Sequence, residues 1–233
     1  MAAQGAAAYD STGWGGDRYG PVFQGIDSAG REITFDLNEV RLRYGWEPKG
    51  SARPAHFLML SEGSESAQRV HKWAGNIRRQ LRVVRTLPGD TTEQALLRSR
   101  NRKRGEIDAP FEVPLVVAVH SVGDRVVLPV DRGDGVENVQ VTRDTAAKCI
   151  GGLVQGYDSV FLLVPESEQA DFAVNLAQKI VEQRDNLVVY TSAGTTHVTP
   201  DGKLVVMGNA GLVTVKRQLF LDFLSATRVE PLR

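Results

Sequence analysis

The chain has 233 residues, 42% of them hydrophobic, and its 28 basic and 28 acidic side chains leave no formal net charge. This length and apolar content suit one large α/β domain with a full core, or one domain with an appendage. Zero net charge excludes an argument for nucleic-acid or membrane binding from bulk charge alone. The single cysteine excludes an internal disulfide, and no apolar run approaches the roughly 18 residues of a membrane span.

The first twenty residues are rich in Gly and Ala and show no periodicity, so we expect a flexible N-terminal arm over 1–20. They lack the basic start and apolar core of a signal peptide. With the lone cysteine, this predicts a reducing, cytoplasmic setting. We expect one α/β domain over 21–233, divided into an opening β-hairpin over 21–50, a core over 55–216, and a C-terminal helix and tail over 217–233.

The opening hairpin is predicted from two apolar runs, 22–26 and 31–35, on either side of a glycine turn. Residues 38–44 add a third strand or a short turn. His56–Leu60 is predicted to be a buried strand. A helix is then expected from about Ser66 to Thr86, because apolar residues recur every three or four positions. These are Val70, Trp73, Ile77, Leu81 and Val84.

The sharpest charge feature lies between Arg69 and Arg104, where eleven basic residues stand against two acidic ones, a local net charge of +9. A second helix or a mobile crossing is expected over Thr91–Arg104. Such a stretch can bind nucleic acid or an acidic partner. The candidate contact residues are Arg98, Arg100, Arg102, Lys103 and Arg104. We favour a solvated helix face followed by a basic loop, because no aromatic residues interleave 98–104 to stack bases.

The stretch from 111 to 167 organises the chain. Its two short apolar runs, Val113–His120 and 159–164, are typical of buried parallel strands. Between them we expect a β-hairpin over 126–141 and a helix that Thr142 caps, running to Val154. The Arg-Gly-Asp triplet at 132–134 is interpreted as turn chemistry rather than as an adhesion motif.

After this stretch the pattern predicts five further elements. They are a helix over Ser167–Arg184, a strand over Leu187–Tyr190, a hairpin over Thr196–Met207 with an Asp-Gly turn, a strand over Gly211–Val215 and a short helix over Gln218–Ala226. Strands that alternate with helices predict an α/β fold with a mostly parallel central sheet, flanking helices and β-hairpin decorations. The runs 115–119, 160–164 and 187–190 should lie side by side and parallel.

Functional residues of open α/β sheets lie just past the carboxyl ends of the strands, where this chain has His120 and Pro165–Ser167. No dinucleotide-binding glycine motif, P-loop or Gly-x-Ser-x-Gly elbow is present. Four scattered histidines and one cysteine give no metal-binding spacing, so neither a metal nor a cofactor is expected. What remains is the arrangement that a Cys/His hydrolase needs, with an imidazole at one strand end and a turn at the next.

The succession VPLVVAVHSVG, VTRDTAAKCIGGL, YDSVFLLVPESE, VVYTSAG and PDGKLVVMG resembles the lonely-Cys type domains of very large actinobacterial polymorphic-toxin-like proteins. These domains are in turn similar to the caspase, gingipain and CHAT group of cysteine peptidases. The segment GIDSAGREITF is similar to a hairpin upstream of such domains. The resemblance covers about residues 22–216 and implies a caspase-like central sheet.

The family pattern has His-Gly after the first strand and a cysteine after the second, in the frame Leu-Leu-x-Cys-x-x-Gly. His120 matches the histidine, and Ser121 stands for the glycine that follows it. The nucleophile position falls on Pro165, and Glu168 stands at the later glycine. Proline can neither attack a substrate nor be activated. The resemblance therefore implies a site whose nucleophile has been lost.

Two other side chains are candidates for the missing nucleophile. Cys149 lies on the intervening helix and is expected to be a buried structural thiol. Ser167 stands two residues after the nucleophile position and is most simply the N-cap of the helix it begins. We retain His120 and Ser167 as candidate catalytic residues, although His120 can equally be a structural histidine.

The favoured hypothesis is a degenerate caspase-like domain that binds or scaffolds within a toxin, phage-like or defence-type assembly, with a protein partner or the larger assembly itself as its ligand. One alternative is a hydrolase or peptidase that depends on His120. Another is nucleic-acid binding through 69–104. Whether the chain is an enzyme stays open at this point.

Overall fold

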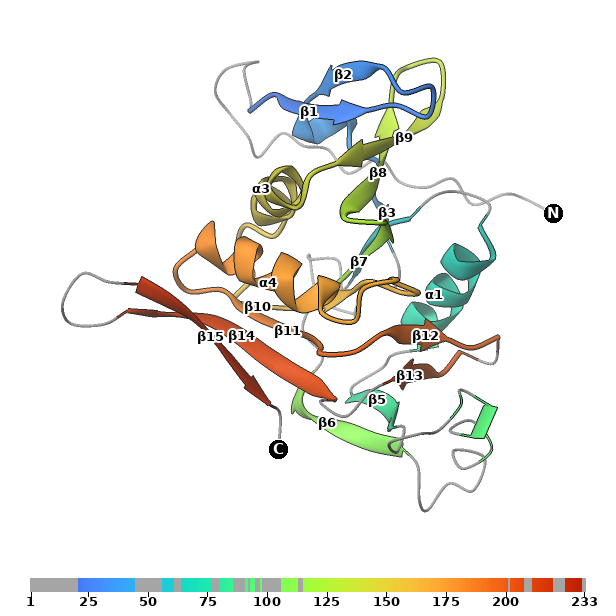
Figure 1. Ribbon diagram of the computed structural model, residues 1–233, viewed down its shortest axis with the longest axis vertical. Coiled ribbons are helices and arrows are strands. Elements are labelled where there is room, and N and C mark those ends of the chain that lie inside the picture. Colours follow the sequence, from blue (N-terminus) through green and yellow to red (C-terminus); the bar gives the residue numbers. More distant parts are fainter. Residues whose placement is uncertain are drawn as a thin grey trace, which may run out of the picture.

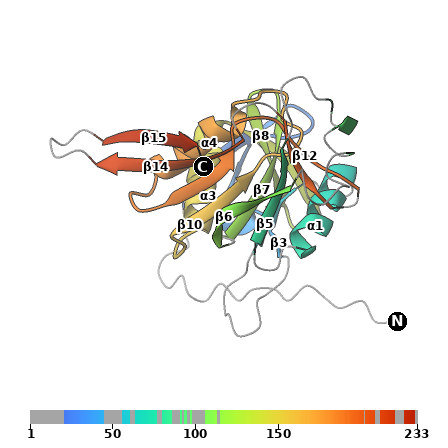
Figure 2. The ribbon, with the colours of Figure 1, turned by 90° about the horizontal axis from the view of Figure 1, so that it is seen from below.

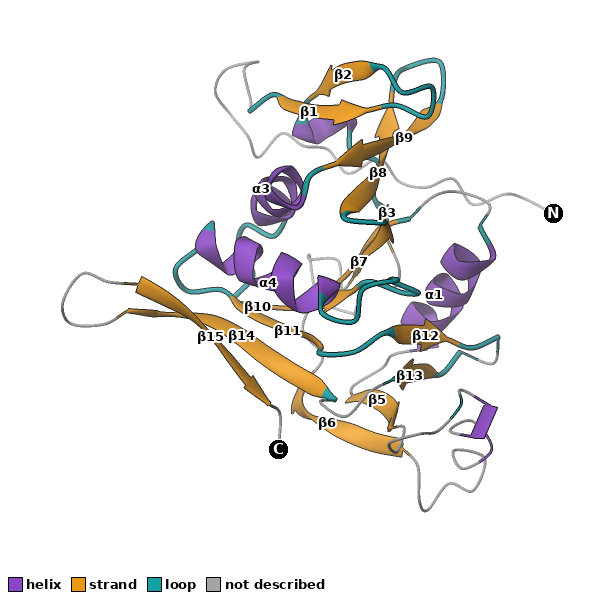
Figure 3. Cartoon of the chain, viewed as in Figure 1, coloured by secondary structure: helices purple, strands orange, loops and turns teal. Residues whose placement is uncertain are grey.

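A computed structural model describes the residues on which every structural statement here rests. They are 21–44, 56–60, 64–76, 80–85, 91, 93–94, 97, 106–112, 115–200, 202–207, 211–219 and 225–231. Within them the chain forms an eleven-stranded mixed sheet, a four-stranded sheet and three α-helices (Figures 1 and 3). The α/β class is therefore confirmed. The expected arm over 1–20 lies outside the described residues.

Four parallel strands form the centre of the large sheet. In spatial order they are β4 (His56–Met59), β7 (Leu115–Val122), β10 (Ser159–Leu163) and β11 (Val188–Ser192). These runs are aliphatic because both of their faces are covered. The prediction that the runs near 115, 160 and 187 lie side by side and parallel is confirmed.

Antiparallel strands extend this centre on both sides. β14 (Leu212–Leu219) pairs with β11, β15 (Ser225–Pro231) pairs with β14, and β3 (Arg43–Tyr44) pairs with β4. The helix predicted over Gln218–Ala226 is therefore wrong at both of its ends, and its middle, 220–224, lies outside the described residues. The ladder from Val213–Pro231 to Leu219–Ser225 satisfies backbone groups that would otherwise form an open edge of β14.

The last residues of β7 leave the parallel centre and pair antiparallel with β8 (Arg125–Asp131). β9 (Val136–Val141) follows β8, and then come β1 (Phe23–Ile26) and β2 (Glu32–Phe35). Both predicted hairpins are thus confirmed. The Arg-Gly-Asp triplet lies in the β8–β9 turn, where the Asp131 side chain accepts a hydrogen bond from Gly133 N at 2.9 Å. Its interpretation as turn chemistry holds.

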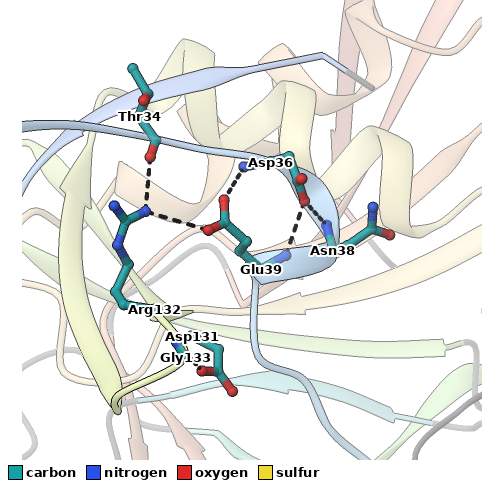
Figure 4. A network of polar contacts seen from close by, with 7 residues as sticks. All are labelled: Thr34, Asp36, Asn38, Glu39, Asp131, Arg132 and Gly133. Carbon is teal, nitrogen blue, oxygen red and sulfur yellow. Dashed lines mark hydrogen bonds and ion pairs between the residues drawn. The ribbon is translucent and has the colours of Figure 1, made fainter. Parts of the chain in front are cut away.

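The β1–β2 hairpin has few backbone links to the sheet, since Ile26–Gln140 is its one register pair with β9. Side chains add to the attachment. Arg132 donates to the carbonyl of Thr34 at 2.9 Å and forms an ion pair with Glu39 at 3.4 Å (Figure 4). Glu39 also completes a capping box with Asp36 around the short 3-10 helix η1 (Leu37–Glu39).

Helices α3 (Arg143–Leu153) and α4 (Phe172–Glu182) cover one face of the central strands. Thr142 caps α3 as predicted, because its hydroxyl accepts from Thr145 N at 3.2 Å. α4 begins at Phe172, five residues after the predicted Ser167, and the side chain of its N-cap Asp171 makes no capping hydrogen bond to the helix backbone. Ser167 belongs instead to the turn before the helix.

The opposite face carries α1 (Glu65–Asn76) together with β12 (Thr196–Val198) and β13 (Leu204–Val206). Figure 2 shows α1 on the far side of the molecule from α3 and α4. The predicted hairpin over Thr196–Met207 is confirmed as the antiparallel pair β12–β13. The sheet is therefore enclosed between two unlike layers.

The helix predicted over Ser66–Thr86 is observed as α1 up to Asn76 and is wrong over Gln80–Arg85, which forms strand β5. β5 pairs parallel with β13 and antiparallel with β6 (Glu106–Glu112), a strand that the sequence pattern did not predict. The β-branched pair Val83–Val84 favours a strand. The apolar residues of this segment have the spacing of a helix, but backbone pairing with β13 makes it a strand.

Close packing of β1 on β9 gives the first prediction. A Cβ at Gly25 would overlap Val139 Cγ1 and lie 3.1 Å from Gln140 O, whereas one at Gly135 would meet nothing within 4 Å. We expect Gly25→Ala to lower the free energy of unfolding by about 1–3 kcal/mol. Gly135→Ala should stay within about 0.5 kcal/mol of the wild type. Urea denaturation measures both, and equal effects would contradict this packing.

Candidate functional site

His120 lies near the end of β7, on the face of the sheet that α1 covers. Val116 and Ala118 precede it by four and two residues and pack in the core cluster that contains Val70 and Trp73 of α1. Because side chains alternate along a strand, His120 belongs to the same face. The imidazole therefore lies on the α1 side of the sheet.

The register of the parallel strands brings the turn after β10 to His120. Leu163 of β10 stands opposite Ala118 of β7. The ladder ends there, and His120 and Pro165 each follow two residues after this last pair. Pro165 is buried and forms an isolated parallel bridge with Thr196. The residue of β10's extension that corresponds to His120 is therefore a proline.

Backbone amides at this turn are not available to an oxyanion. Pro165 has no N–H, and the N–H of Glu166 donates to the carbonyl of Thr196 at 2.7 Å. The Thr196 hydroxyl completes the link by donating to the carbonyl of Val164 at 2.9 Å. An oxyanion hole needs N–H groups directed at the reacting oxygen. Residues 165 and 166 offer none.

Glu166 is the one non-glycine residue with positive φ in the described chain, at φ 57°. This left-handed conformation is uncommon for a residue with a Cβ and breaks the side-chain alternation of the strand. The carboxylate lies on the α1 side, where its Oε1 is 3.7 Å from Arg69 Nη1. Arg69 also forms an ion pair with Glu65, one turn earlier in α1.

Two side-chain nitrogens of these residues, His120 Nε2 and Arg69 Nε, are buried without a hydrogen-bond partner. Burial lowers the pKa of His120 below its ordinary value, and the charge of Glu166 opposes that shift. The imidazole is therefore neutral at pH 7, so one of its nitrogens is a hydrogen-bond acceptor. The charge of Glu166 thus acts on His120, and Glu166 is itself paired with Arg69. Neither Glu166 nor Arg69 was among the candidate catalytic residues.

Ser167 was retained as a candidate catalytic residue and as a helix N-cap. The prediction of an N-cap is wrong, since α4 begins at Phe172. The serine side chain is buried, and its hydroxyl donates to the carbonyl of Gln169 at 3.1 Å. Because His120 Nε2 has no partner, that nitrogen does not receive the proton of Ser167. The hydroxyl serves the turn instead.

Cys149 is fully buried on α3, as predicted for a structural thiol. It packs with Val117 and Leu162, which face α3, while His120 faces α1. The central sheet therefore lies between the thiol and the imidazole. Burial raises the pKa of Cys149 to about 12.

The candidate partner-binding residues of the basic stretch lie outside the described residues: Arg98, Arg100, Arg102, Lys103 and Arg104. Two other basic residues of the stretch are engaged within the chain. Arg69 contacts Glu65 and Glu166, and Lys72 donates to the carbonyl of Pro200 at 2.8 Å. These two cations are therefore partly committed to internal contacts.

Two surface cavities lie away from His120. One, of about 540 Å³, is lined by Phe23, Gly152 and Arg184 among others, and the second, of about 800 Å³, lies between Arg31 and Arg132. No group of three or more potential metal ligands occurs within the described ranges. No helix in the part of the chain that is described is long and apolar enough to cross a membrane.

Comparison of the chain with protein-family models, curated proteins and solved structures found no match. The site must therefore be interpreted from its own geometry and chemistry.

The burial of Cys149 predicts slow thiol chemistry. A shift of its pKa from 9.0 to about 12 reduces the thiolate fraction near pH 8 on the order of a thousandfold, before any barrier to access. Iodoacetamide should therefore label the native protein at least that much more slowly than the urea-unfolded chain. Fast labelling of the native protein with an ordinary thiol pH profile would contradict the assigned burial.

The lowered pKa of His120 predicts a pH-dependent stability. The folded state binds the imidazole proton less tightly than the unfolded state, whose pKa is near 6.5. Stability is therefore fully present above pH 6.5 and falls as the pH decreases below it. Between about pH 7.5 and about pH 5, the wild type should lose more stability in urea denaturation than His120→Gln. Parallel pH curves for the two proteins would exclude this effect.

Proposed function

We propose that this chain is a degenerate caspase-like domain that acts as a non-catalytic binding or scaffolding module in a toxin, phage-like or defence-type assembly. One observation carries the proposal. The β7–β10 register ends at the pair Ala118–Leu163, and two residues after it the chain has His120 on one strand and, on the other, Pro165, which has no nucleophilic atom and no N–H. The parallel order of β7 and β10 is also the arrangement in which a Cys/His peptidase would present its pair.

Two further observations support the loss of peptidase chemistry. The only thiol, Cys149, packs on the α3 side of the sheet with a pKa of about 12. The amide of Glu166, which follows the nucleophile position, is already bonded to Thr196. A nucleophile, an oxyanion hole and a base would all have to meet at one point. Of these, the described residues around the end of β7 supply only the imidazole.

A binding role suits what the turn retains. The turn has a left-handed backbone at Glu166, and two buried nitrogens near it, on His120 and Arg69, are unpaired. A reaction at Pro165 cannot explain these features. Strained residues and buried unpaired polar groups concentrate at ligand sites. We therefore assign recognition of a protein partner to this edge of the sheet.

A second candidate function, a hydrolase that depends on His120, is favoured by the unpaired Nε2 atom. A neutral imidazole can remove a proton from water, so water would replace the missing side-chain nucleophile. Glu166 would then stabilise the imidazolium that forms. This candidate lacks an oxyanion hole from residues 165 and 166.

Hydrolytic assays separate the two candidates. We expect the wild type to cleave fluorogenic peptide and ester substrates no faster than His120→Gln, since no nucleophile stands at 165. Lys148→Gln on α3, an exposed residue on the other face, serves as the matched control. Turnover that His120→Gln reduces by about a hundredfold, and that Lys148→Gln leaves unchanged, would replace the binding module by the hydrolase.

A further inference from the structure

Strand β15 (Ser225–Pro231) ends the large sheet and has a free edge in the described part of the chain. It pairs with β14 without a register shift, and no described strand pairs with its other side. Figures 1 and 2 show the two strands together at one side of the molecule. β15 has seven residues, whereas β2 at the opposite end of the sheet has four. A long, regular edge strand is a template for pairing with another chain.

The direction of the backbone groups of β15 follows from the strands before it, because these groups point alternately to the two sides of a strand. The N–H of Val188 in β11 donates to the carbonyl of Asp158, just before β10, at 3.0 Å. The next residue, Val189, therefore points to β14, where it lies opposite Val215. The two neighbours of Val215 in turn point away from β11 and towards β15.

This alternation leaves Thr227 and Val229 with outward backbone groups. Lys216, one of the β14 residues that point to β15, lies opposite Arg228. The residues on either side of Arg228 therefore present their N–H and C=O groups to the free edge. Pro231, two residues after Val229, agrees with this pattern, because proline occurs in sheets where an N–H would face away from the neighbouring strand.

The side chains of β15 are complementary to those of a second β15 that runs antiparallel to it. Val229 is 36% exposed and lies between Arg228 and Glu230. Pairing about Val229 places Arg228 of each copy opposite Glu230 of the other, and opposite charges at such positions are favourable. Outward groups recur at every second residue, so the register moves in steps of two. A step either way places Arg228 opposite Arg228 or Glu230 opposite Glu230, which is unfavourable.

We propose that β15 pairs antiparallel with β15 of a second copy of this chain, with Val229 opposite Val229 and Arg228 opposite Glu230. The interface is isologous, so each contact occurs twice. Each Val229 N–H donates to the Val229 carbonyl of the other copy, and each Thr227 N–H donates to its Pro231 carbonyl. Pro231 has no N–H to donate and ends the ladder. Two eleven-stranded sheets then become one.

Dimerisation does not depend on the proposed function, since neither His120 nor Pro165 takes part in it. The ladder is short, so we expect a dissociation constant on the order of 10 to 100 µM for the full chain. Sedimentation equilibrium over protein concentrations from about 1 µM to about 1 mM covers this range.

The first pair of variants tests the backbone ladder. Val229→Pro removes the central outward N–H, while the bonds of β15 to β14 stay in place because the N–H of Val229 does not point to β14. It should weaken dimerisation about tenfold or more. Val229→Thr is the matched control, because it keeps both the N–H and a β-branched side chain. Its dissociation constant should stay within about threefold of the wild-type value.

The second pair of variants tests the register. Arg228→Glu places two carboxylates opposite each other in the dimer, and Glu230→Arg places two guanidinium groups opposite each other. Each variant alone should dimerise about tenfold or more weakly than the wild type. An equimolar mixture should recover dimers, because every pair across the interface is then of opposite charge. Glu32→Arg on β2, at the other end of the sheet, is the control and should leave dimerisation unchanged.

Recovery on mixing supports both the interface and its register, and it also shows that both variants fold. A wild type that stays monomeric throughout the concentration range overturns the proposal and leaves the edge to a strand of another protein. A dimer that Val229→Pro does not weaken overturns it as well, because the copies then meet elsewhere. Loss of dimers in both charge variants without recovery in the mixture overturns the pairing of Arg228 with Glu230.

Discussion

The backbone pairing of β7 is the constraint on which the rest of the structure depends. Its first half pairs with β4 on one side and β10 on the other, and its last residues pair with β8. A buried strand must satisfy every N–H and C=O group, and its residues 115–119 are almost completely buried. This eight-residue strand therefore positions the parallel centre, the β8–β9 side of the sheet and the layers packed on both faces.

The central strands could be predicted because their aliphatic runs admit one interpretation. The structure of segments 80–85 and 218–226 could not be predicted, since each is short and its apolar residues are spaced in a way that suits both a helix and a strand. Their structure is decided by β13 and by the β14–β15 ladder, partners that local periodicity does not reveal. The predicted start of α4 was early because Ser167 resembles a cap but bonds within a preceding turn.

His120 could be placed from the sequence because strand ends in α/β sheets are where functional residues gather. Glu166 and Arg69 could not be placed near this site from the sequence. The position of the Glu166 carboxylate depends on a left-handed backbone at a residue type that rarely adopts one, and Arg69 was one of eleven basic residues in its stretch. Only the packing of α1 on this face of the sheet shows which of those cations approaches the turn.

The attachment of the β1–β2 hairpin has a dynamic consequence. Phe23 and Phe35 are buried with their ring centres 5.7 Å apart, so the hairpin has an apolar anchor, but its ladder to β9 is a single pair. Opening it therefore breaks few backbone hydrogen bonds and the contacts of Arg132, while β7 and β10 stay intact. We therefore expect the amide protons of the hairpin to exchange with solvent through partial unfolding, ahead of those of the central strands.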